Sequence, residues 1–269
     1  MRAREEILRI IRNNTSMSYL IGISGKGGVG KTTLSALIIR RLIARGKKPV
    51  LAVDADPNTC LDSNLGVKAE HTIGRVREEA RREAAKGLGA GISKQQLLEM
   101  KISESLVEAV DFDLIAMGRA EGPGCYCYAN NVLKQAIHTI SNEYPYVVLD
   151  NEAGMENLSR RIVQRVDLLV MVADPSRRGL DTLKRLHDVT TEMEITYGKL
   201  ALVVNRMRRA ELPDYALTLK QVTGADFLIG LPDDPELAEF GEGGKNLAEV
   251  PSENPVVKCI DELLDAAGL

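Results

Sequence analysis

Residues Gly25 to Thr32 follow the pattern G-x-x-x-x-G-K-T, and this run constrains the fold more than any other feature of the chain. An apolar segment, residues 19–23, comes directly before it, and a segment of helical character begins near Thr32. Glycines let successive backbone N–H groups turn to one side, and the helix that follows adds the positive end of its dipole. The run therefore predicts a strand, a phosphate-binding loop and a helix in immediate succession.

Apolar runs typical of buried parallel strands recur along the chain, with helix-length segments between most of them. We expect strands at residues 19–23, 50–53, 114–117, 146–149, 168–172 and 200–204 and a shorter one before Gly230, with helices at about 31–45, 72–86, 129–142, 156–164, 178–196 and 256–267. Strands that alternate with helices form a covered parallel sheet. The expected fold is α/β, of the P-loop NTPase type, with a mostly parallel central sheet of about seven strands and helices on both faces.

Length and composition suit one globular domain. We expect residues 17–269 to form it, and residues 1–16 to be a helical extension, because Ile7, Leu8, Ile10 and Ile11 have helix-like spacing among charges. A net charge of −3 gives no general reason to expect nucleic acid as a partner. No apolar run reaches the roughly 18–20 residues needed to cross a bilayer. We therefore expect a cytoplasmic protein that binds neither nucleic acid nor membrane.

The loop pattern predicts ATP or ADP and Mg²⁺ as ligands. Lys31 is expected to reach the β- and γ-phosphates, and the Thr32 hydroxyl to bind Mg²⁺. The expected nucleotide contacts comprise the whole run: Gly25, Lys26, Gly27, Gly28, Val29, Gly30, Lys31, Thr32 and Thr33.

Carboxylates follow two of the expected strands. Asp54 and Asp56 end the second strand, and Asp150 ends the fourth. In open α/β sheets ligands bind at the carboxyl ends of the strands, so these groups should lie beside the phosphate loop. A carboxylate there can orient the attacking water or hold the water shell of Mg²⁺.

Lys26 is surplus to an ordinary phosphate loop. The run GKGGVGKTT resembles the deviant Walker A loop of the family that contains MinD, ParA and the nitrogenase iron protein. The resemblance implies a homodimer in which Lys26 crosses to the partner's ATP and stabilises the transition state. It also implies an ATPase, with Asp56 as the switch and water-positioning residue and Asp150 as the Walker B carboxylate. Further implied nucleotide contacts are Gly154 near the γ-phosphate and Asn205, Arg206, Pro232 and Asp233 near the adenine.

Cys125 and Cys127 lie one residue apart in the loop GPGCYCYANN. Two such thiols can bind nickel or zinc together but supply only half of a four-coordinate shell. A two-fold dimer with this loop near its axis would supply the other half. Incidental cysteines or a redox pair remain alternatives.

The segments GRAEGPGCYCYANN, DNEAGMENLSRR and VDADPN resemble the CooC group, including its acetyl-CoA synthase counterpart AcsF. That resemblance implies a dimerising, ATP-hydrolysing metallochaperone that handles nickel in maturation of carbon monoxide dehydrogenase or acetyl-CoA synthase. It assigns no role to Cys60, Cys259 or Glu152.

Two other functions stay open. One is a positioning or partition ATPase of the MinD and ParA type, although the C-terminal segment lacks the basic face of a membrane-surface helix. The other is an iron–sulfur electron-transfer ATPase like the nitrogenase iron protein. Thiolates alone do not choose between nickel, zinc and an iron–sulfur cluster.

Overall fold

The computed structural model describes residues 18–86, 100–119, 134, 140–152 and 165–269. Within them, eight strands form one sheet in the order β3-β4-β2-β5-β1-β6-β7-β8. Their bounds are β1 (Tyr19–Gly25), β2 (Val50–Asp54), β3 (Val107–Glu108), β4 (Phe112–Ala116), β5 (Tyr146–Asp150), β6 (Arg165–Ala173), β7 (Thr196–Met207) and β8 (Phe227–Pro232).

The expected fold class is confirmed. Each of the seven expected strands is present, and every pairing is parallel except that of β3 with β4. β3 is the addition, and its two residues are too few to produce a hydrophobic period.

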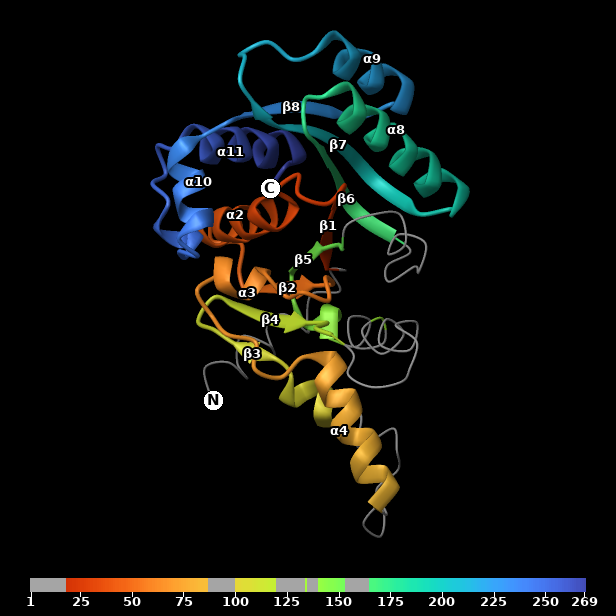
Figure 1. The fold of residues 1–269 in the computed structure, drawn as a ribbon, viewed down its shortest axis with the longest axis vertical. Coiled ribbons are helices and arrows are strands. Elements are labelled where there is room, and N and C mark those ends of the chain that lie inside the picture. The colour runs from red at the N-terminus through yellow and green to blue at the C-terminus, as the bar shows by residue number, and fades with distance from the viewer. Residues whose placement is uncertain (1–17, 87–99, 120–133, 135–139, 153–164) are drawn as a thin grey trace.

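The helices with bounds inside the described residues are α2 (Lys31–Ala44), α3 (Leu61–Asn64), α4 (Ile73–Lys86), α8 (Arg177–Glu192), α9 (Asp214–Thr223), α10 (Pro235–Glu242) and α11 (Pro255–Ala267), with 3₁₀ turns η1 (Ser141–Glu143) and η2 (Leu247–Glu249). Residues 100–104 are helical as well. None of these helices is both long and apolar enough to span a bilayer. Figure 1 shows α2, α10 and α11 beside one part of the sheet, α8 and α9 beside the other, and α4 extending from the end near β3.

Three helix predictions match within about two residues, and others need correction. The helix expected at 178–196 ends at Glu192, because Glu194 adopts a left-handed backbone (φ 55°) and β7 begins at Thr196. α9 and α10 were not expected. The segments 1–16 and 156–164 lie outside the described residues, as does most of 129–142.

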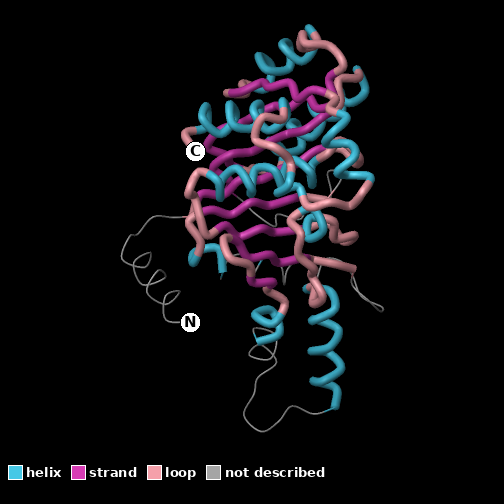
Figure 2. The backbone as a smooth tube through the Cα atoms, turned by 90° about the vertical axis from the view of Figure 1, so that its left-hand side faces the viewer, coloured by secondary structure: helices cyan, strands magenta, loops and turns pink. Residues whose placement is uncertain are grey.

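Alternating side chains give the sheet two buried faces. Ile21, Ile23 and Val170 pack with α2 and α11 in the largest core cluster. Leu169 and Met171 face the other way and pack with Leu180 and Leu183 of α8. Figure 2 shows the resulting layers, with helices flanking a stack of strands. The carboxyl ends of the central parallel strands therefore lie along one edge of a sheet that helices cover on both faces. The residues that follow these strands lie at the same edge.

Candidate nucleotide site

The carboxyl ends of β1, β2 and β5 meet at one edge of the sheet. Ile23 is opposite Asp150 in the β1–β5 register, and Asp54 is opposite Asp150 in the β2–β5 register. β1 then leaves the sheet at Gly25. The structure thus brings together the glycine run and the carboxylates that the sequence predicts as neighbours.

The glycine run turns away from the sheet and opens α2 at Lys31. Gly28 and Gly30 have φ angles of 78° and 93°, which L side chains rarely adopt. No heavy atom lies within 4 Å of where a Cβ on Gly28 would be, so the loop has open space above it. α2 has no side-chain cap, which leaves the N–H groups of its first turn available to an anion.

Lys31 is buried at the base of this loop. The residue is 7% exposed, and its Nζ donates to the carbonyl of Lys26 over 3.2 Å. Burial lowers the pKa of Lys31, while the charges of Asp150, Asp56 and Glu152 act in the opposite direction. A buried cation at the base of an anion-binding loop is suited to a phosphate group.

Asp150 and Asp54 form a buried carboxyl pair beneath the loop, and both are 0% exposed. Burial and then the charge of Asp54 raise the pKa of Asp150 to about 7, although Thr32, Ser35 and Lys31 act against the rise. Ser35 Oγ donates to Asp150 Oδ1 over 3.0 Å.

The other oxygen of Asp150, Oδ2, has no hydrogen-bond partner in the structure. A buried, unsatisfied carboxylate oxygen costs free energy. A hydrated divalent cation supplies what this oxygen lacks, so the donor set of Asp150 and the Thr32 hydroxyl fits Mg²⁺.

Asp54 and Asp56 do different work. Asp54 accepts hydrogen bonds from the N–H groups of Asp56, Cys60 and Leu61. Burial raises its pKa to about 6 in spite of these bonds. Asp54 therefore fixes the loop after β2 and the start of α3.

Asp56 lies in that loop and is partly exposed. Its Oδ1 accepts from the backbone N–H and the side-chain amide of Asn58, over 2.8 and 3.0 Å. Asn58 in turn accepts from Arg119 over 2.7 Å. Asp54 ends β2 and is buried, whereas Asp56 follows β2 and is accessible.

The residues expected near the adenine line a cavity of about 520 Å³ together with Gly30 and Thr33 of the loop and helix. These residues are Asn205, Arg206, Pro232 and Asp233. Asp234, also in the lining, is engaged as the N-cap of α10 and accepts from Leu237 N–H over 2.8 Å. The cavity extends from the phosphate loop outward between β7 and α10.

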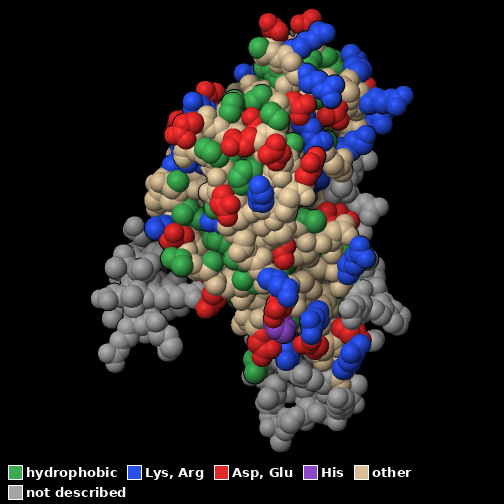
Figure 3. All heavy atoms as spheres, turned by 60° about the vertical axis from the view of Figure 1, so that its left-hand side comes forward, with side chains coloured by type: hydrophobic (Ala, Val, Ile, Leu, Met, Phe, Trp, Pro, Cys, Tyr) green, Lys and Arg blue, Asp and Glu red, His purple; other side chains and the backbone are tan. Residues whose placement is uncertain are grey.

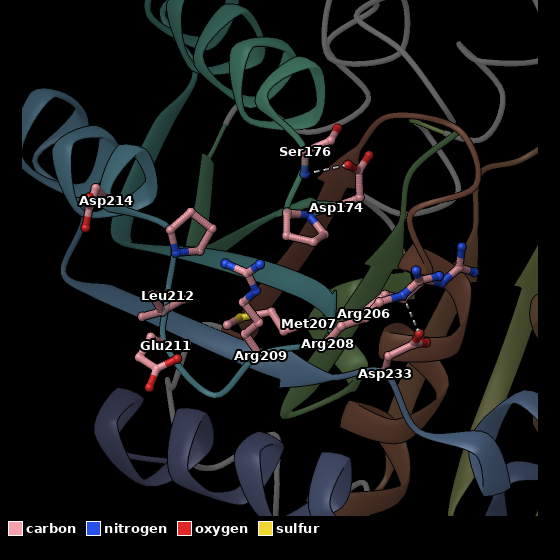
Figure 4. Close-up of a pocket in the computed structure, with 12 residues that line it drawn as sticks. Asp174, Ser176, Arg206, Met207, Arg208, Arg209, Glu211, Leu212, Asp214 and Asp233 are labelled. Atoms are coloured by element: carbon pink, nitrogen blue, oxygen red, sulfur yellow. Dashed lines mark hydrogen bonds and ion pairs between the residues drawn. The ribbon is translucent and has the colours of Figure 1, made fainter.

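A second cavity of about 780 Å³ adjoins this one and shares Arg206, Arg208 and Asp233 with it. Figure 4 shows Arg208 paired with Asp233 (3.5 Å) and the N–H of Ser176 donating to Asp174. Burial would raise the pKa of Asp174, but bonds from Ser176 and the charge of Lys26 lower it overall. Lys26 itself is exposed.

Charged side chains of both signs surround this second cavity. Arg206, Arg208 and Arg209 are exposed, and four carboxylates, Asp174, Glu211, Asp214 and Asp233, belong to the same lining. Figure 3 shows Lys and Arg side chains intermixed with Asp and Glu side chains on the face that it presents.

Some predicted site residues cannot be placed. Cys125, Cys127 and Gly154 lie outside the described residues. In the part of the chain that is described, no three His, Cys, Asp or Glu side chains gather into a possible metal site.

Two contributors to the site were missed by sequence reasoning. Ser35 bonds to Asp150, and Asn151 Nδ2 donates to the Ile23 carbonyl over 2.8 Å. Ser35 could have been found from the sequence, because it is the one hydroxyl residue within the apolar stretch LSALII of α2. Asn151 had none beyond its place after a strand.

Comparison with known proteins gives three findings. The family model described as an AAA domain matches residues 19–200. An uncharacterized ATP-binding protein of Methanocaldococcus jannaschii is 39% identical over 250 residues, covering 91% of this chain and 97% of that protein. The carbon monoxide dehydrogenase accessory protein CooC of Rhodospirillum rubrum is 28% identical over 236 residues, covering 83% and 87%.

Solved structures extend the likeness to three dimensions. The septum site-determining protein MinD of Pyrococcus horikoshii, complexed with Mg-ADP, superposes with a TM-score of 0.63 at 19% identity. The match covers 93% of this chain and 95% of that one, and at this identity it concerns the fold.

Proposed function

The chain belongs to the AAA-domain family and has the fold of the MinD/ParA-type ATPases, and from this premise we propose that it binds MgATP at the glycine loop and hydrolyses it. The observation that carries the proposal is the arrangement around Asp150. Its buried Oδ2 lacks a partner, the hydroxyl of Ser35 donates to Oδ1 of the same carboxyl group, and the charge of Lys31 acts on it. Relatives whose names state ATP or Mg-ADP binding support the same ligand.

Each residue of the loop then has a distinct task. The first N–H groups of α2 and the Lys31 ammonium would bind the phosphate oxygens. Asp150 and Thr32 would hold Mg²⁺, with Asp150 acting through water. Bound Mg²⁺ neutralises charge on the β- and γ-phosphates. The cavity beside Gly30 and Thr33 would receive the base.

Hydrolysis is a displacement at the γ-phosphorus. A water oxygen bonds to phosphorus, the bond to the β–γ bridging oxygen breaks, and ADP, phosphate and one proton result. Asp56, the accessible carboxylate after β2, is proposed to orient that water. Lys26 is exposed and free to reach a second copy, where it would stabilise the transition-state charge.

The test separates binding from chemistry. Wild-type protein should bind MgATP and release phosphate, with a rate per chain that rises with protein concentration if Lys26 acts across a dimer. Lys26→Ala should bind MgATP within about threefold of wild type yet hydrolyse it on the order of 100-fold more slowly. Normal hydrolysis by Lys26→Ala would remove the trans-acting role, and absence of MgATP binding by the wild type would remove the function.

We further propose that nucleotide-driven dimerisation serves a metal cargo. Cys125 and Cys127 of two chains would supply four thiolates to one nickel or zinc ion, which would be passed to carbon monoxide dehydrogenase or acetyl-CoA synthase. The support is the C-x-C spacing and the 28% identity with CooC, whose name states that it is an accessory protein of carbon monoxide dehydrogenase.

Anaerobic purification followed by elemental analysis and an absorption spectrum tests this cargo. We expect about one metal ion per two chains, abolished by Cys125→Ser while MgATP binding is kept. A brown, iron-containing protein would instead indicate the iron–sulfur alternative, and metal-free protein after nickel or zinc addition would remove the metal role.

A positioning role is the second candidate, favoured by the structural likeness to MinD. It predicts that liposomes or DNA stimulate ATP hydrolysis severalfold. The metallochaperone proposal predicts no such stimulation.

A further inference from the structure

We infer that Asn205 is a positioning residue whose side-chain amide latches the phosphate loop to the end of β7, so that it shapes the loop for any polyphosphate instead of reading the base. The inference rests on the proposed ATP site and adds a residue that determines the geometry of its loop.

The amide of Asn205 is occupied at both ends. Its Nδ2 donates to the carbonyl of Val29 over 2.8 Å, across 176 residues of sequence. Its Oδ1 accepts from the N–H of Arg206 over 2.9 Å. The side chain is thus aligned by the backbone N–H of the next residue and directed into the loop.

The bond to Val29 controls the direction of a peptide group. The Val29 side chain is anchored in the core at 3% exposure, so the latch acts on its carbonyl. In a planar trans peptide the C=O and the following N–H point in opposite directions. Holding the Val29 carbonyl toward Asn205 therefore turns the N–H of Gly30 to the opposite side of the loop, and backbone N–H groups are what such a loop offers to phosphate.

Contact between the two segments is close. A Cβ on Gly30 would lie 2.5 Å from Asn205 Nδ2, so the amide occupies the space that any side chain would need. Gly30 has a φ of 93°, the conformation that leads from the loop into α2. The latch and the glycine are thus fitted to one another.

The end of β7 is bent in a way that presents Asn205. Its pairing with β8 shifts register between Val204 and Met207, and Arg206 has a φ of 60°. Such irregularities re-aim side chains at the ends of strands, and a non-glycine residue with this φ costs free energy. Here the irregular segment begins at the residue that bonds to the loop.

A latch and a base contact make opposite predictions about ligands. Asn205→Leu keeps the side-chain volume but loses both hydrogen bonds. If Asn205 holds the loop, this variant should bind ATP, GTP and inorganic tripolyphosphate more weakly by the same factor, roughly fivefold or more. If it reads the base, ATP alone should weaken and tripolyphosphate should not. Isothermal titration with Mg²⁺ present measures all three, with weak ligands measured by competition.

Leu237→Ala is the matched control. Leu237 lines the same cavity from α10 and does not belong to the loop. It should alter nucleotide affinity without changing that of tripolyphosphate. Asn205→Ser serves as a milder variant if Asn205→Leu folds poorly, which thermal unfolding will show.

Hydrogen–deuterium exchange of the ligand-free protein tests, independently of nucleotide binding, whether Asn205 holds the phosphate loop. Peptides covering residues 28–34 should exchange several times faster in Asn205→Leu than in the wild type, and at the wild-type rate in Leu237→Ala. Unchanged exchange, or a loss confined to ATP, would overturn the latch. If wild-type protein binds no nucleotide the proposed function fails, and the exchange rates still decide this inference.

Discussion

The two ends of α2 use charge in opposite ways. At its N-terminus Lys31 is buried, and the nearby Asp150 keeps one oxygen without a partner. At its C-terminus Arg41 and Arg45 pair with Asp261 of α11 over 2.9 and 2.8 Å, and Arg45 also reaches Asp265 over 2.6 Å. One end is poised for a ligand at a cost in stability, whereas the other is complete and stabilises the fold.

A substitution at the N-terminal end of α2 should nearly abolish ATP hydrolysis without unfolding the protein, and this is the largest effect that we expect. Lys31→Ala removes the buried ammonium from the loop, so MgATP hydrolysis should fall by a factor on the order of 1,000. The free energy of unfolding should stay within about 1 kcal/mol of wild type, because a partly desolvated charge is removed as well. Phosphate release measures the activity and urea unfolding the stability. A loss of several kcal/mol in Lys31→Ala would show that this end of α2 also holds the fold together.

The C-terminal end should behave in the opposite manner. Arg45→Ala removes bonds to Asp261, Asp265 and the carbonyl of Leu269, so the free energy of unfolding should fall by about 3 kcal/mol. ATP turnover per folded chain should not change. Lys258→Ala, an exposed residue of α11, is the control and should cost less than about 0.5 kcal/mol. Reduced turnover at full folding would link the two ends.

Asp150→Asn should change the pH dependence of stability at the N-terminal end of α2. The pKa of Asp150 is raised to about 7 from 3.8, so the native state holds this proton more tightly than the unfolded chain. The contribution of protonated Asp150 to the free energy of unfolding is therefore fully present below about pH 4 and is lost as pH rises toward 7.

The variant carries no such charge. Without ligand it should be more stable than wild type by roughly 2 kcal/mol at pH 8 and equal to it near pH 4. Thermal unfolding at the two pH values is the measurement. Equal stability at pH 8 would show that the ionised Asp150 carboxylate does not destabilise the native state.

Asp261→Asn should show the reverse pH dependence and the smallest effect. Although burial acts to raise it, bonds from Arg41 and Arg45 hold the pKa of Asp261 below its ordinary value of 3.8. Its stabilisation is therefore present above that value and lost as pH falls below it. The variant should be about 1 kcal/mol less stable than wild type at pH 7 and no different near pH 2. A constant difference would assign the loss to packing.

What the sequence could predict depended on how local the cause was. The strands β1, β2 and β5 are short apolar runs, so they could be predicted. The turn at Gly28 and Gly30 could also be predicted, because it depends on a short local motif. α9 and α10 were not predicted because neither shows a clear helical period of apolar residues, although Pro213 and Asp234 precede their first residues.

The division of labour at the site could not be predicted in the same way. Asp54 and Asp56 look alike in sequence, and only the folded loop shows that Asp54 accepts three backbone bonds. The contact between Asn205 and Val29 joins segments that are far apart in the chain. Such roles arise from tertiary distance, which hydrophobic period and motif spacing do not encode.

The place of β1 in the middle of the sheet has a consequence for biosynthesis. β1 pairs only with β5 and β6 among the described strands, and the first of these begins at Tyr146. At about 5–20 residues per second, the ribosome needs roughly 6–25 s to make that partner after it has made β1. During this interval the glycine loop has no sheet to support it, so a nascent chain should acquire affinity for nucleotide only after more than half of it has been translated.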